Sequence, residues 1–196
     1  MCWAHVPTSA QIRAFTATQH HTPLTYTEVG WTRDGRAPSR YALDHHLAVL
    51  GSGEACFRRA ADALRHWGMF RTDWITLCTP DRPFAVGETL VLHVRHLGFH
   101  SVIANRVVYA IEEPARMVFG YGTLTGHAEQ SEERFQVVMD DAGTVSFELL
   151  AFPGPRHPLA RLGTRTMRVL QRQAAAAYSG AMQRAVTDWA GAPGFR

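Results

Sequence analysis

The sequence contains no lysine, and all 20 of its basic residues are arginine. A phosphate-binding P-loop needs a lysine, and so does any enzyme that forms a Schiff base through its own side chain. Both classes are therefore excluded. The arginines are scattered among 17 carboxylates rather than gathered into a patch, so the net charge of +3 does not indicate a nucleic-acid partner.

Cysteine is also scarce. Cys2, Cys56 and Cys78 form no CxxC pair and are odd in number, which is typical of reduced thiols. No apolar run approaches the length of about 18 residues that a membrane span needs, and the first residues lack the apolar core of a signal peptide. We therefore expect a cytoplasmic protein without a membrane partner.

Motifs for metal binding and for a serine nucleophile are missing. There is no HExxH and no GxSxG. His93 and His96 lie three apart in a predicted strand, so they face opposite sides and do not readily share a metal. We expect neither a metal nor another cofactor.

The length of 196 residues and the apolar fraction of 46% predict a single domain with a substantial core. Alternating apolar patterns predict strands, and short turns between the last five of them predict antiparallel pairing. The expected strands are residues 24–29, 41–50, 73–78, 89–96, 101–111, 116–123, 133–139 and 144–152.

Three segments have helical periodicity. They are residues 11–18, a helix between Gly53 and Gly68, and a long final helix over residues 159–189 whose apolar stripe includes Tyr178 and Met182. This order of elements predicts an α+β helix-grip fold. In this fold a curved antiparallel sheet wraps around a long C-terminal helix, and an internal cavity lies between the sheet and the helix. Residues 1–23 are expected to be an extension, residues 24–190 the domain and residues 191–196 a tail.

The stretch 118–135 carries the clearest chemical pattern. Gly120, Gly122 and Gly126 are unfavourable in or beside a strand unless the backbone bends or another group approaches closely. Near the tip of this hairpin, His127 is followed by carboxylates, which suggests an acid/base group at the rim of a pocket. The alternative is a solvated turn whose carboxylates bind arginines.

Several short motifs occur in an order that resembles one protein family. They are Tyr-Thr-Glu-Val-Gly at 26–30, Leu-Gly at 50–51, Trp67 with Met69, Arg-Val-Val-Tyr at 106–109, Phe-Gly-Tyr-Gly-Thr-Leu at 119–124, Gly-His at 126–127, Glu-Glu-Arg-Phe at 132–135 and Ala-Phe at 151–152. From about residue 24 to residue 186 the chain resembles the domain of unknown function 1990 family, found in bacteria and plants. The resemblance implies similarity to START/Bet v 1-like (SRPBCC) helix-grip proteins. Glu148 departs from it, because an uncharged strand residue is expected there.

The pattern and the resemblance together give a set of candidate site residues. Expected catalytic residues are His127, Tyr109, Tyr121 and Glu133, and expected ligand-binding residues are Trp67, Phe119, Tyr178, Met182 and Arg106. The two strand tyrosines are expected to present their hydroxyls to a ligand, or else to be hydrogen-bonded in the core. Strand alternation puts Arg106 on the face opposite Tyr109, with a hairpin glutamate as its expected ion-pair partner.

The expected function is binding of a small apolar or aromatic molecule in the cavity between sheet and helix. The resemblance implies a cofactor-free enzyme of the cyclase, aromatase or isomerase type, acting on a polyketide-like or aromatic biosynthetic intermediate. Such enzymes hold a flexible chain in one conformation while a few polar groups move protons. The alternatives are a non-catalytic carrier, whose pocket is almost wholly apolar, and a partner-binding module with a filled interior. We expect a monomer or homodimer.

Overall fold

The computed structural model describes residues 2–79, 83–96, 98–125, 127, 129–152, 154–155 and 164–188. Within them, eight strands form one antiparallel sheet in the order β2-β9-β8-β6-β5-β4-β3, with β1 paired to β5. The strands of this sheet are β1 (Cys2–Trp3), β2 (Asp44–Ser52), β3 (Ile75–Leu77), β4 (Thr89–His96), β5 (Phe99–Glu113), β6 (Arg116–Thr123), β8 (Glu132–Met139) and β9 (Thr144–Ala151).

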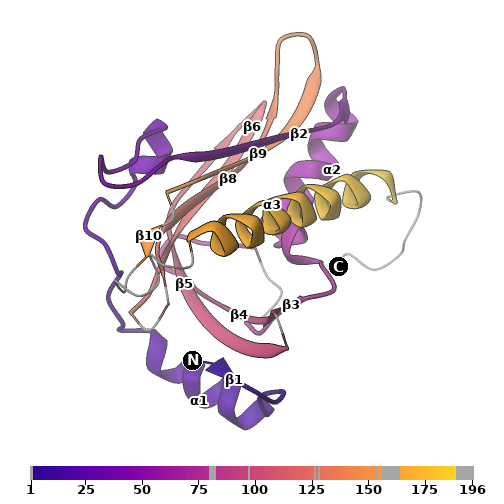
Figure 1. Ribbon diagram of the computed structural model, residues 1–196. Coiled ribbons are helices and arrows are strands. Elements are labelled where there is room, and N and C mark those ends of the chain that lie inside the picture. Colours follow the sequence, from indigo (N-terminus) through magenta and orange to yellow (C-terminus); the bar gives the residue numbers. More distant parts are fainter. Residues whose placement is uncertain are drawn as a thin grey trace.

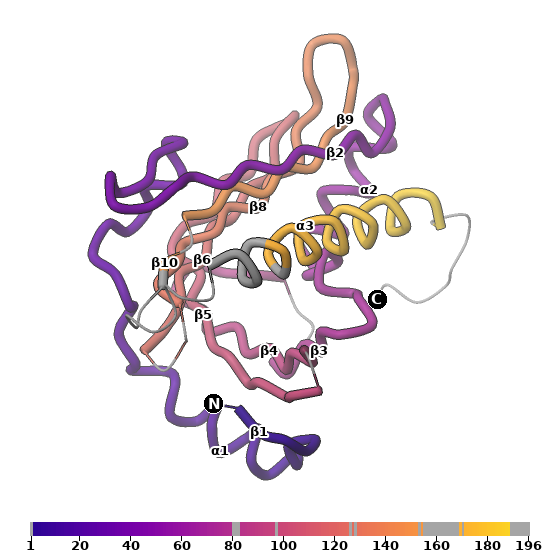
Figure 2. Tube along the Cα trace, viewed as in Figure 1, coloured from indigo at the N-terminus to yellow at the C-terminus, as the bar shows by residue number. Residues whose placement is uncertain are grey.

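The long helix α3 (Thr164–Thr187) runs across the concave face of the curved sheet (Figure 1). Helix α2 (Glu54–Arg65) and the 3-10 turn η2 (Gly68–Phe70) pack beside it. We call the face that these helices cover the inner face. The opposite face of the sheet is the outer face. Helix α1 (Ser9–Gln19) and the 3-10 turn η1 (Trp31–Asp34) belong to the N-terminal segment, which runs along the outer side of the sheet (Figure 2). The predicted α+β helix-grip architecture is confirmed.

The main core lies between the inner face and the helices. Its most deeply buried rings are Phe119, Phe135 and Phe147, each at most 1% exposed. A second, smaller cluster lies on the outer face, where Val91, Val102 and Ala104 meet side chains of α1 and β1. Because burial of apolar surface stabilises a fold by about 25 cal/mol per Å², the inner cluster dominates its stability.

Most of the predicted elements are confirmed. β4 and β6 have the predicted bounds, and the predicted helix over residues 11–18 lies within α1. Residues 159–163, residue 189 and Gly126 lie outside the described part of the chain.

The predicted strand over residues 24–29 is wrong. β6 already pairs with β5 on one side and β8 on the other, so no free edge of β6 remains beside this segment. The segment is attached at single points instead: Leu24 bridges Leu124, and the Thr25 N–H donates to the carbonyl of Thr123.

The hairpin glycines are explained by close approach. A Cβ on Gly120 would overlap the ring of Tyr109, and one on Gly122 would overlap the ring of Tyr26. Both tyrosines therefore lie flat against the sheet where a side chain would otherwise stand. No helix in the described residues is both long and apolar enough to cross a bilayer.

Candidate functional site

A tyrosine and a glutamate meet on the inner face at the centre of the sheet. Tyr121 in β6 and Glu133 in β8 are register partners, and partners in an antiparallel pair share a face. The Tyr121 hydroxyl donates to Oε2 of Glu133 over 2.9 Å. The alternation of β8 thus directs Glu133 towards α3, although its neighbour Glu132 points outward.

The environment of this pair favours a protonated carboxyl near neutral pH. Burial raises the pKa of Glu133 to about 7, opposed by the hydrogen bond from Tyr121, and the charge of Glu129 raises it further. Burial also raises the pKa of Glu129, against the donation of Gln171 Nε2 to its Oε1 over 3.3 Å. A carboxyl with a pKa near 7 both accepts and releases protons at neutral pH.

Aromatic rings surround the carboxylates. Tyr178 of α3 packs edge-on against Phe70 with ring centroids 5.4 Å apart, and it stacks on Trp74 at 6.1 Å. Burial, followed by the charges of Glu133 and Glu129, raises the pKa of Tyr178 well above its ordinary value. The site therefore combines an apolar wall with a small number of polar groups, as ligand sites commonly do.

The other predicted ligand-binding residues on this face lie deeper. Trp67 packs edge-on against Phe119 with centroids 5.2 Å apart, and Met182 is completely buried. Trp67 also has a left-handed backbone, with φ of 59°. These four predicted residues therefore share the inner face, where all of them belong to the main core cluster.

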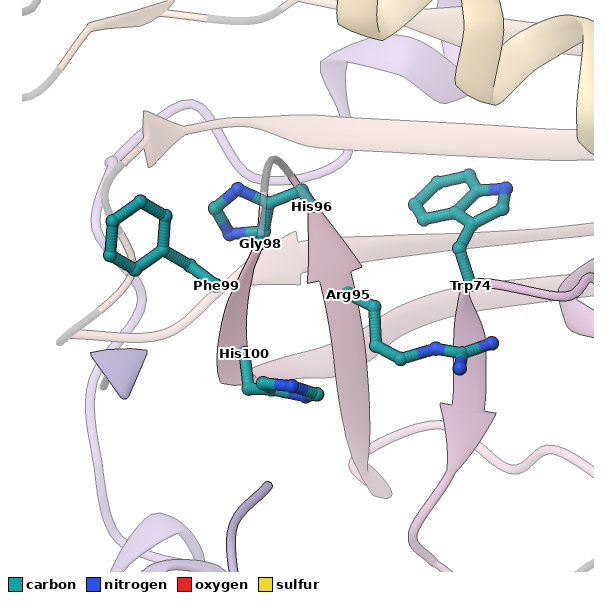
Figure 3. Close-up of a pocket in the computed structure, with 6 residues that line it drawn as sticks. All are labelled: Trp74, Arg95, His96, Gly98, Phe99 and His100. Carbon is teal, nitrogen blue, oxygen red and sulfur yellow. The ribbon is translucent and has the colours of Figure 1, made fainter. Parts of the chain in front are cut away.

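The inner face is less tightly covered towards β3, β4 and β5. There, the inward side chains Val94, His96, Ser101 and Ile103 are only half-buried. A surface groove of about 410 Å³ lies at this end of the sheet (Figure 3), lined by Trp74, Arg95, His96, Gly98, Phe99 and His100. Trp74 thus lines the groove and also stacks on Tyr178.

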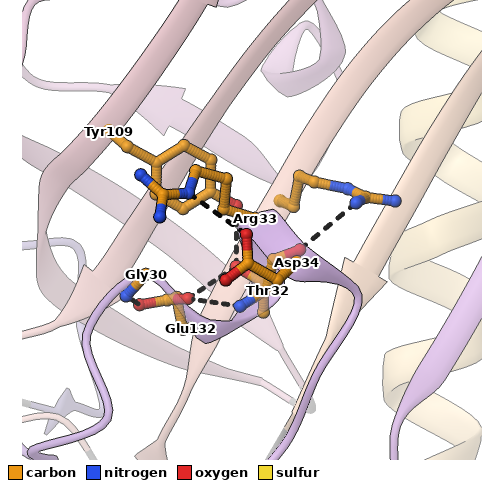
Figure 4. A network of polar contacts seen from close by, with 7 residues as sticks. Gly30, Thr32, Arg33, Asp34, Tyr109 and Glu132 are labelled. Atoms are coloured by element: carbon orange, nitrogen blue, oxygen red, sulfur yellow. Dashed lines mark hydrogen bonds and ion pairs between the residues drawn. The ribbon is translucent and has the colours of Figure 1, made fainter.

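Tyr109 is found on the outer face, apart from Tyr121. Its hydroxyl shares a 2.7 Å hydrogen bond with Thr32, and Thr32 in turn donates through Oγ1 to Glu132 over 2.6 Å (Figure 4). Glu132 also accepts from the backbone N–H groups of Gly30 and Thr32 and from the Tyr26 hydroxyl. This buried carboxylate therefore anchors η1 to the sheet.

Arg106 also lies on the outer face, on the same side as Tyr109 rather than opposite it. The register between β5 and β6 shifts between Val107 and Tyr109, and this bulge cancels the expected alternation. The predicted ion pair with a hairpin glutamate is wrong. The guanidinium donates to the carbonyls of Gln19, His20 and Thr22, where it binds the C-terminal end of α1.

His127 lies at the tip of the hairpin, as predicted, in a half-buried position. Its Nδ1 accepts a hydrogen bond from the N–H of Glu129 over 3.0 Å, so the ring proton is on Nε2. Burial lowers the pKa of His127 to about 4. The imidazole is therefore neutral at neutral pH, which makes it a weak base, whereas the pKa of Glu133 is about 7.

Two polar residues of the inner side were missed from the sequence. Gln171, two helical turns before Tyr178, donates to Glu129. Asn105 in β5 is 1% exposed. Asparagine is depleted in strands, so its presence in an apolar strand run was a usable signal. Glu148, the departure noted above, accepts from Arg134 and Gln136 on the outer face. In the described part of the chain, no three potential metal ligands come together.

Comparison with solved structures places the fold among helix-grip proteins. The Zhui aromatase/cyclase from Streptomyces sp. R1128 superposes with a TM-score of 0.54 at 16% identity, covering 78% of this chain and 98% of that one. Norcoclaurine synthase from Thalictrum gives a TM-score of 0.53 at 12% identity, covering 80% and 100% respectively. At these identities the likeness concerns the fold.

Sequence relatives are found in bacteria and in eukaryotes. A UPF0548 protein of Deinococcus radiodurans is 38% identical over 190 residues, covering 91% of this chain and 96% of the relative. A UPF0548 protein of Dictyostelium discoideum is 30% identical over 188 residues, covering 85% and 87%. The profile of the domain of unknown function DUF1990 matches residues 25–181, so the chain belongs to the DUF1990 family.

Proposed function

We propose that this protein binds a small apolar or aromatic molecule between the inner face of its sheet and α3, and that Glu133 moves protons on it. The observation that carries the proposal is the half-buried Glu133, held by the Tyr121 hydroxyl, with a pKa near 7. The reaction class is proton transfer at a carbon next to a carbonyl, of the kind that cyclases, aromatases and isomerases use.

The geometry supports a division of roles. Rings such as Phe70, Trp74 and Tyr178 supply apolar contact that restricts a flexible substrate to few conformations, which lowers the entropic barrier. The Glu133 carboxylate takes a proton from the carbon, and the electron pair of the broken C–H bond passes into an enolate. Glu133 then returns the proton to a different atom. Tyr121 is a positioning residue that orients the carboxylate.

The fold comparison supports the same class, since an aromatase/cyclase and a synthase share this architecture. Arg106 and Tyr109 lie on the outer face and take no part in the proposal. His127 contributes through Nε2–H as a neutral donor at the rim.

The test uses 2-tetralone, an aromatic ketone whose acidic C–H groups exchange with solvent. In D2O near neutral pH, NMR follows the loss of the C1 proton signal with and without protein. We expect the wild-type protein to accelerate exchange, and Glu133→Gln to lower that acceleration by about 100-fold, the usual contribution of a general base. Glu113→Gln, which removes an exposed carboxylate of the β5–β6 turn, is the matched control.

Two results would contradict the proposal. Equal acceleration by wild type and Glu133→Gln would remove Glu133 from the chemistry. Saturable binding of 2-tetralone to wild type without any acceleration would instead establish a non-catalytic binding protein, the second candidate, which the apolar side chains of the inner face also suit.

A further inference from the structure

One side chain on the inner face is buried without any hydrogen bond. Asn105, the only asparagine in the sequence, is 1% exposed. Neither its Oδ1 nor its Nδ2 has a hydrogen-bond partner. The other unpaired buried side chains in the described part of the chain, such as Ser131, each lack a partner at one atom. Asn105 differs because two polar atoms of one side chain, an acceptor and a donor, are both unpaired.

An amide in this position is unfavourable unless something else compensates for it. An unpaired buried polar group is destabilising by about 1–3 kcal/mol, and asparagine is also a poor strand former. Unpaired buried groups in native proteins are few, and functional sites are where such destabilised groups are retained.

Asn105 lies on the same face of the sheet as the Tyr121–Glu133 pair. Val102 and Ala104 belong to the outer cluster and Val107 to the inner core, so alternation places Asn105 on the inner face. Val107 is the register partner of Tyr121, and Asn105 lies two residues earlier, about 7 Å along the strand. Across the sheet, the partner of Asn105 is Thr123, whose hydroxyl accepts from the N–H of Ser131.

We propose that Asn105 selects ligands that carry a neutral polar group with a hydrogen-bond acceptor and a donor side by side. A carboxamide, a lactam and a hydroxy-ketone are groups of this kind. The side-chain carboxamide of asparagine has an acceptor oxygen and a donor nitrogen on the same carbon. A ligand group with a donor and an acceptor side by side therefore forms two hydrogen bonds with it and satisfies Oδ1 and Nδ2 together. The inference rests on the proposed function, because it assumes that a ligand occupies the inner face.

The charges around the site favour a neutral ligand over an anionic one. Glu129 and Glu133 are the acidic groups of this cluster, and their hydrogen-bond partners are the neutral side chains Gln171 and Tyr121. A carboxylate or phosphate would meet these carboxylates without a compensating arginine among the side chains that the structure describes here.

The test compares three naphthalenes of similar size by equilibrium dialysis. 2-Naphthamide carries an acceptor and a donor, 2-acetylnaphthalene an acceptor alone, and 2-ethylnaphthalene neither. For wild type we expect 2-naphthamide to bind about tenfold more tightly than 2-ethylnaphthalene, or about 1.4 kcal/mol, with 2-acetylnaphthalene between them. Asn105→Leu, which keeps the branched shape without polar atoms, abolishes this order and also raises Tm.

A second variant keeps the test valid if Asn105→Leu does not fold. Asn105→Ala is smaller than the native residue and is expected to lose the same preference. Equal affinity of wild type for all three compounds, or an unchanged preference in either variant, overturns the inference and leaves the proposed function intact. Absence of binding by all three overturns the proposed function together with it.

Discussion

The inward carboxyl of Glu133 is expected to destabilise the protein at high pH. Its pKa is raised from 4.5 to about 7 by folding. A raised carboxyl pKa means that the folded state holds the proton more tightly than the unfolded chain. The loss of folding free energy caused by ionisation of Glu133 is therefore absent below about pH 4.5. It grows as the pH rises to about 7 and is constant above that.

The magnitude follows from the same values. A tenfold change in an ionisation constant corresponds to about 1.4 kcal/mol, so the full penalty reaches about 3 kcal/mol at pH 8 and less than about 1 kcal/mol at pH 5. Glu133→Gln keeps an acceptor for the Tyr121 hydroxyl and carries no charge. We expect this variant to be more stable than wild type, with a gain that grows by about 2 kcal/mol between pH 5 and pH 8.

Urea unfolding of both proteins at the two pH values measures this difference. The comparison between variants cancels the other groups that titrate over the same range. Glu113→Gln again controls for the loss of one negative charge, because Glu113 is exposed at the β5–β6 turn. A gain for Glu133→Gln that is the same at pH 5 and pH 8 would refute the assignment of a raised pKa to Glu133.

Three further substitutions test the outer face. Gly120→Ala places a methyl group against the ring of Tyr109 and should destabilise the protein by about 2–3 kcal/mol in urea unfolding. Gly180→Ala in α3 is the control: its added Cβ would lie 3.4 Å from Nη1 of Arg184, so the change should be neutral or stabilising. Glu132→Gln leaves a single acceptor oxygen for four donated hydrogen bonds. It should lower the free energy of unfolding by about 2–4 kcal/mol, and a loss below about 1 kcal/mol would contradict the role of Glu132 in anchoring η1. Arg106→Met should speed hydrogen exchange in α1 while leaving β4 protected, and unchanged exchange in α1 would show that the three carbonyl contacts are dispensable.

The sheet was predictable because its strands follow the alternation of apolar residues closely. β4 and β6 appear at their predicted bounds, since each is flanked by strands that follow in sequence and pairs locally. The segment over residues 24–29 has the same local pattern. Whether this segment forms a strand depends on whether a neighbouring strand has a free edge to pair with, and that is a property of the assembled sheet.

The site was only half predictable for a similar reason. Tyr121 and Glu133 lie on regular strands, so their shared face follows from the hairpin register. Tyr109 and Arg106 are separated by a bulge, and nothing in the local residue pattern reveals the extra residue that turns both outward. The low pKa of His127 and the raised pKa of Glu133 likewise depend on burial, which the sequence alone does not supply.

The claim that a ligand lies on the inner face has a direct spectroscopic test. Because Asn105 is the only asparagine, labelling the protein with 15N-asparagine gives one pair of side-chain amide signals. We expect both signals to shift when wild-type protein is saturated with 2-naphthamide. Unmoved signals at saturation, with binding verified by dialysis, would place the ligand elsewhere and contradict the account.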